Sequence, residues 1–175
     1  MSARASTRGP GRSPGARVGP ARALRPGDAL GYPAIMSVAA IYIDYLETEG
    51  FRPSLDEAGD VLFKCEGRSY YLMVDDDDPH YFRLLFPNFW GIDGAPERQR
   101  ALLAASEVTA EIKVAKVYVL GDDTQATAEM FLADPHDLRK VFERALRALQ
   151  GAVRRFCEIM QDRQRPRLRL VEENN

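Results

Sequence analysis

The sequence has few of the residues from which most catalytic and metal sites are built. Among 175 residues there are only two cysteines and two histidines. Cys65 and Cys157 lack the short spacing of zinc and redox motifs, and two cysteines are too few for a disulfide scaffold. Such sparse use of cysteine is typical of a reducing compartment, so we expect a cytoplasmic protein whose thiols are free.

Long apolar runs and a basic globular part are also missing. No apolar stretch reaches the roughly 18 residues of a membrane-spanning helix, and we therefore expect no membrane insertion. The formal net charge is -2, but residues 1–35 carry +5 through their arginines, so the remainder carries -7. An acidic remainder makes a nucleic-acid-binding core an unfavoured hypothesis, because such cores have basic surfaces.

Residues 1–33 are rich in arginine, glycine and proline and contain almost no large apolar side chains. This composition cannot bury enough surface to offset its ordering entropy, and it predicts a disordered arm. The arm also lacks the apolar core of a secretory signal. Two other interpretations stay open: a basic arm for RNA, DNA or an acidic membrane surface, and upstream sequence that is not translated, since Met36 precedes the first periodic segment.

Residues 61–90 predict an antiparallel meander of three strands. In three stretches, apolar and polar residues alternate with the two-residue period of a half-buried strand. The first two stretches flank a hairpin turn, and the third follows an acidic run. Gly67 and Arg68 predict a two-residue hairpin turn with glycine first. Pro87 lacks the donor that a sheet requires and predicts the end of the third strand.

Further segments complete the expected fold. Apolar residues recur at helical spacing over 34–49, 96–112 and 138–159, with Leu102 and Leu103 widening the stripe of the second segment. A short edge strand is expected within 51–56, and a second hairpin over 116–132. The sequence therefore predicts an α+β domain over 34–162, in which an antiparallel sheet of about five strands packs against two or three helices. Residues 163–175 are expected to form a frayed tail.

The acidic run Asp75 to Asp78, with His80, is the most conspicuous polar cluster. Oxygen-rich sets of this kind bind magnesium or calcium in some proteins. Here the run links two strands and lacks the glycine and the downstream glutamate of a calcium loop, so a solvated turn is the favoured interpretation. No serine lies in a nucleophile elbow, and no cysteine has a neighbouring histidine in the sequence. We predict no catalytic residue, no metal site and no cofactor.

The stretch from Phe86 to Trp90 is the candidate binding surface. Phe86, Phe89 and Trp90 follow the third strand, where aromatic side chains commonly fill the end of a core. The other interpretation is that they anchor a partner, since aromatic residues supply much of the binding energy at interfaces.

Three phrases and the order of the elements resemble the bacterial YbjN family, which is similar in fold to type III secretion chaperones. The phrases, within residues 36–160, are GRSYYLMVDDDDPHYFRLLFPNFW, AKVYVLGDD and VFERALRALQGAVRRF. The resemblance implies helices packed on an antiparallel sheet, pairing as homodimers, and binding of peptides or proteins. The arginine-rich start resembles nothing in the family.

Three functional hypotheses follow. The first is a non-enzymatic, chaperone-like or regulatory module that binds an unidentified peptide or protein client as a homodimer. The second is a metal-dependent enzyme that uses the cluster from Asp75 to His80. The third is a nucleic-acid-associated factor that uses the basic arm. The resemblance and the lack of a catalytic constellation favour the first.

Overall fold

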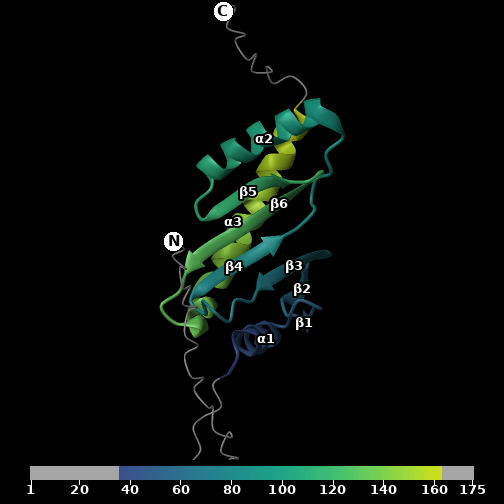
Figure 1. The fold of residues 1–175 in the computed structure, drawn as a ribbon. Helices are drawn as coiled ribbons and strands as arrows, with labels where there is room; N and C mark the ends of the chain where they lie inside the picture. Colours follow the sequence, from purple (N-terminus) through teal and green to yellow (C-terminus); the bar gives the residue numbers. More distant parts are fainter. Residues whose placement is uncertain (1–35, 163–175) are drawn as a thin grey trace, which may run out of the picture. The chain divides into compact units, whose positions relative to one another are not determined.

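The computed structural model describes residues 36–162 (Figure 1). The predicted arm at 1–33 and the predicted tail at 163–175 lie outside the described residues. In chain order the elements are α1 (Val38–Thr48), β1 (Ser54–Leu55), β2 (Val61–Cys65), β3 (Arg68–Met73), β4 (Tyr81–Phe86), α2 (Gly94–Glu111), β5 (Ala115–Leu120), β6 (Asp123–Phe131), the short 3-10 helix η1 (Pro135–Asp137) and α3 (Leu138–Gln161).

The α+β fold and the order of its elements are confirmed. The six strands form one antiparallel sheet in the order β1-β2-β3-β4-β6-β5, so the predicted edge strand brings the number slightly above the expected five. Leu84 of β4 lies opposite Leu72 on one side and Ala128 on the other. All three side chains are fully buried, because this face of the sheet lies against the helices.

Helix α3 supplies the other half of the core and crosses the sheet diagonally (Figure 1). The predicted apolar stripe over 138–159 is confirmed, and its members recur at alternating steps of four and three. Its buried members are Leu138, Phe142, Ala145, Leu149, Ala152, Phe156 and Ile159. The ring of Phe142 contacts Tyr45 of α1 at 5.3 Å between centroids and Phe63 of β2 at 5.6 Å. This one side chain therefore links α1 and the sheet to α3.

The prediction that Leu102 and Leu103 widen the buried stripe of α2 is wrong. They are 52% and 43% exposed, and the buried residues are Ala101, Ala104, Ala105 and Val108. The small alanine side chains let α2 pack closely against both α3 and β5. The alanine side of the helix is therefore buried, and the two leucines point outward.

The hairpin turn between β2 and β3 lies one residue earlier than predicted. Cys65 pairs with Arg68, so the two loop residues are Glu66 and Gly67. Their φ angles of 50° and 76° place both in the left-handed region, which is the geometry of a type I′ turn. Glu66 is the first residue of this turn, and Arg68 is the first residue of β3 after it.

The face of the sheet opposite α3 is not covered by any described helix. Leu62, Tyr71 and Leu85 lie side by side across β2, β3 and β4 on this open face, and each is half-buried. Within residues 36–162, no helix is both long and apolar enough to cross a membrane.

Each edge of the sheet has a feature that opposes the addition of another strand. At the β5 edge, the hydroxyl of Thr109 in α2 accepts from the N–H of Val117 at 3.0 Å and donates to its carbonyl at 3.3 Å. At the other edge, β1 has only two residues. Addition of a partner strand, which needs a row of free backbone groups, is therefore restricted at either edge.

Truncation of Phe142 tests the role of the aromatic packing. We expect Phe142→Ala to lower the free energy of unfolding by about 3–5 kcal/mol, because a buried ring leaves a cavity that the surroundings fill only partly. The matched control is Phe131→Ala, whose ring is 78% exposed and whose loss should change stability by about 0.5 kcal/mol or less. Urea denaturation measures both, and equal effects would contradict the assignment of the core.

Candidate functional site

The three predicted binding residues lie together at the end of β4, partly buried against the core. Phe86 and Phe89 stack with their ring centroids 5.8 Å apart, and Phe89 meets Phe156 of α3 edge-on at 5.3 Å. Trp90 contacts the same Phe156 at 6.1 Å. Phe156 itself is fully buried. The aromatic cluster of Phe86, Phe89 and Trp90 is thus an extension of the core that keeps a partly exposed surface.

Trp90 has polar partners at both its backbone and its ring. Its carbonyl accepts from the hydroxyl of Thr124 at 3.0 Å, and its indole N–H donates to the Glu97 carboxylate at 3.1 Å. Glu97 also accepts from the backbone N–H of Asp93 at 2.7 Å, at the start of α2. The N–H of Asp93 and then the indole N–H lower the pKa of Glu97 below its usual value. These contacts fix the orientation of Trp90.

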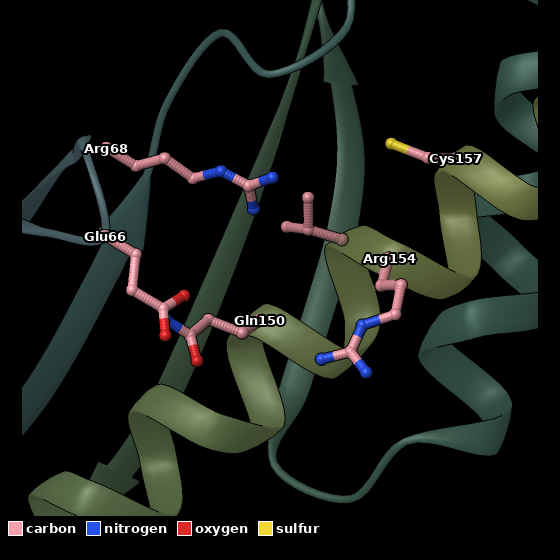
Figure 2. Close-up of a pocket in the computed structure, with 6 residues that line it drawn as sticks. Glu66, Arg68, Gln150, Arg154 and Cys157 are labelled. Carbon is pink, nitrogen blue, oxygen red and sulfur yellow. The ribbon is translucent and has the colours of Figure 1, made fainter.

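A cleft of about 310 Å³ opens next to the aromatic cluster, between the β2–β3 turn and α3 (Figure 2). We call it the hairpin-helix cleft. It is lined by Glu66, Arg68, Gln150, Val153, Arg154 and Cys157. Glu66 comes from the turn, Arg68 is the first residue of β3, and α3 supplies the other four. Arg68 extends from the turn across the cleft toward α3 (Figure 2).

Two contacts hold the walls of the cleft in place. The guanidinium of Arg68 lies over the ring of Phe86, 5.8 Å from its centroid, within the range of a cation–π interaction. The side-chain amide of Gln150 donates to the hydroxyl of Tyr70 at 3.4 Å. Phe86 therefore belongs both to the aromatic cluster and to the support of the cleft.

The two thiols near the cleft are not activated. Burial raises the pKa of Cys157, although the positive charge of Arg68 opposes the rise, and burial also raises the pKa of Cys65. A thiol with a raised pKa is mostly protonated at neutral pH and is a weak nucleophile. The lining of the cleft thus combines charged side chains with a thiol of raised pKa.

The acidic run forms the link between β3 and β4, as the favoured interpretation predicts. The carboxylate of Asp75 accepts from the backbone N–H groups of Asp77 and Asp78 at 3.1 and 3.2 Å, which is a turn that the side chain closes itself. The ring of His80 lies 3.1 Å from the carbonyl of Leu132. In the described part of the chain, no group of three histidine, cysteine or acidic residues is placed to hold a metal ion.

A second polar cluster lies on the open face of the sheet, around Glu129 of β6. Burial alone would raise the pKa of Glu129, but hydrogen bonds from Lys116, Thr127 and Tyr81 outweigh it and lower the pKa. Arg83 lies 3.6 Å from the same carboxylate. Since the carboxylate of Glu129 is engaged by partners on its own and neighbouring strands, we regard this cluster as structural.

Sequence reasoning missed the hairpin-helix cleft, although part of its signal is in the sequence. Gln150, Val153, Arg154 and Cys157 are spaced at i, i+3, i+4 and i+7, so they share one side of a helix. This side of the helix lies next to its apolar stripe and carries polar as well as apolar residues. The contribution of the turn was not predictable in the same way, because it depends on the pairing of Cys65 with Arg68.

Comparison with protein-family models finds none that matches the chain, and comparison with curated proteins also finds no match. The resemblance to the YbjN family therefore stays a prediction from the phrases and the order of elements.

Acid titration tests the contact between Trp90 and Glu97. The lowered pKa of Glu97 means that its interactions stabilise the folded protein fully above the ordinary pKa of 4.5 and are lost as the pH falls through the lowered value. Trp90 is the sole tryptophan, so its fluorescence reports directly on this carboxylate. We expect an emission change with a midpoint below pH 4.5 that Glu97→Gln removes and the control Glu49→Gln leaves in place. A midpoint at or above 4.5 would contradict the hydrogen-bonding scheme.

Proposed function

We propose that this protein is a non-enzymatic, chaperone-like module that binds a peptide or protein segment in the cytoplasm. The hairpin-helix cleft and the neighbouring aromatic cluster form the binding surface. The resemblance to the YbjN family, with its likeness to type III secretion chaperones, agrees with this function.

The observation that carries the proposal is the continuity of the cleft with the aromatic cluster. Phe86 contacts the guanidinium of Arg68 and also stacks on Phe89. A bound segment thereby meets apolar and charged groups in one stretch. Partner surfaces commonly combine a partly buried aromatic anchor with polar groups at its margin.

A binding function is favoured over a catalytic one by the chemistry of the same surface. The thiol of Cys157 has a raised pKa. The metal-enzyme alternative would use Asp75 and His80, but Asp75 is hydrogen-bonded within its own turn and the His80 ring contacts a backbone carbonyl. The nucleic-acid alternative depends on the arm at 1–33, which lies outside the described residues.

We also propose that the protein pairs as a homodimer, through the open face of the sheet. The small face of α2 and the long stripe of α3 are buried within the same chain and are not available for pairing. The row formed by Leu62, Tyr71 and Leu85 is then the apolar surface that a second copy would cover. Symmetric pairing of one such row on its copy fits the self-complementary interface of a two-fold dimer.

Peptide selection tests the binding function. Short random peptides are selected on the immobilised full chain, and the affinity of a retained peptide is measured by calorimetry. We expect Phe89→Ala to weaken binding by more than about 1 kcal/mol, as truncation of an aromatic anchor does, while circular dichroism shows an intact fold.

Phe131→Ala is the control for this selection, since Phe131 is an exposed aromatic residue on the opposite face of the sheet. It should leave the affinity unchanged. Selection that retains no peptide would contradict the proposed function, and a loss of affinity in Phe131→Ala alone would move the binding surface to the open face. Trp90→Ala is a poorer probe, because its indole N–H also holds Glu97 at the start of α2.

Light scattering tests the pairing. At a protein concentration on the order of tens of micromolar, we expect the mass of a dimer for the wild type and a shift toward the monomer for Leu85→Lys, because a charge on the open face opposes its burial. Leu102→Lys, on the outward side of α2, should keep the mass of the wild type. A monomeric wild type would refute the pairing.

A further inference from the structure

Two adjacent arginines of α3 differ in their charge partners. Arg155 forms hydrogen-bonded ion pairs with Glu111 at 2.9 Å and with Glu107 at 3.0 Å, and so ties α3 to α2. Arg154, the next residue toward the N-terminus, faces the hairpin-helix cleft and has neither an ion pair nor a hydrogen bond among the residues that the structure describes. An unpaired guanidinium keeps all its donors available for a ligand.

Arg68 brings a second unpaired guanidinium to the same cleft from the opposite wall. Its contact is with the face of the Phe86 ring, which leaves the N–H groups at the edge of the guanidinium plane free to donate. Among the described side chains, no carboxylate forms an ion pair with it. Its side chain extends across the cleft toward the α3 wall, which carries Arg154 and Cys157 (Figure 2).

The cleft therefore has an excess of positive charge, and one of its polar side chains is held in a fixed orientation. The two arginines face a single carboxylate of the lining, that of Glu66. Gln150 is held by Tyr70, so its amide is already oriented. Guanidinium groups bind carboxylates through two parallel hydrogen bonds, and such charge-assisted bonds are about twice as strong as neutral ones. Glu66 in turn can accept from a backbone N–H of a bound segment.

We propose that the hairpin-helix cleft binds the carboxylate side chain of an acidic peptide segment, with Arg68 and Arg154 as its donors and Glu66 as the acceptor for a neighbouring peptide N–H. The volume of about 310 Å³ is at the lower end of ligand pockets and suits one side chain with its backbone. The aromatic cluster beside the cleft then takes an apolar neighbour of the acidic residue. This inference rests on the proposed function and specifies its ligand.

The test uses peptides retained in the selection on the full chain. We expect them to be enriched in aspartate or glutamate, and replacement of that acid by its amide in the peptide to weaken binding about tenfold or more, which is the usual effect of losing a charge-assisted pair. Arg68→Gln and Arg154→Gln should each weaken binding of the acidic peptide by a similar factor. In Arg154→Gln, the change from acid to amide in the peptide should then have a much smaller effect.

Arg144→Gln is the matched control. Arg144 is an exposed arginine of the same helix, ten positions before Arg154 and outside the lining of the cleft. It should bind both peptides as the wild type does. Circular dichroism of all three variants checks that the fold is intact, which we expect because Arg68 and Arg154 are both exposed.

A second arm separates a peptide carboxylate from a free anion. Amide NMR titrations with N-acetylglutamate and with inorganic phosphate follow the signals of the β2–β3 turn and of α3. Shifts with N-acetylglutamate that Arg154→Gln abolishes support the carboxylate site, and stronger binding of phosphate would overturn it in favour of a phosphate site. Retained peptides without an acidic preference, whose affinity ignores both arginine variants, would overturn the inference and leave the proposed function standing. A selection that retains no peptide would refute the function itself.

Discussion

The packing of Phe142 against rings from three other segments is the interaction on which the rest of this structure depends. Tyr45 comes from α1, Phe51 from the loop that follows it, and Phe63 from β2. From Phe63 the contacts continue through Tyr70 to Phe86 and on to Phe89. A continuous aromatic layer thus lies between the sheet and α3. Because each ring buries a large apolar area, the layer fixes how far α3 stands from the β2–β3 turn.

The hairpin-helix cleft is a consequence of this layer. Tyr70 buries its ring in the layer but presents its hydroxyl to Gln150 at the cleft. Phe86 likewise stacks on Tyr70 within the layer and also contacts the guanidinium of Arg68. The cleft is therefore supported by side chains that cannot move without disturbing the core. A site supported in this way loses little conformational freedom when a ligand binds.

The elements were predictable because their signals are local, whereas the cleft depends on contacts distant in the sequence. The stripe of α3 and the alternation in β2 to β4 follow from apolar spacing alone, and the structure confirms both. The position of the β2–β3 turn was off by one residue because Glu66, a non-glycine residue, adopts a left-handed φ of 50°. Leu102 and Leu103 are apolar and at helical spacing, yet the close approach of alanines decides which side of α2 is buried. Arg154 and Arg155 are neighbouring arginines that the sequence alone does not distinguish. The position of α2 gives Arg155 its ion pairs with Glu107 and Glu111, while Arg154 faces the cleft.

The restricted edges of the sheet bear on how a partner segment could bind. At β5 the hydroxyl of Thr109 occupies the outward N–H and carbonyl of Val117, and β1 has only two residues next to Pro53. When a partner adds a strand to a sheet, the main-chain hydrogen bonds give the affinity and the side-chain pockets give the selectivity. Where these features oppose such bonds, side-chain contacts supply more of the affinity. Those contacts are selective by nature, since a guanidinium pair discriminates an acid from its amide, while a backbone ladder does not distinguish the two.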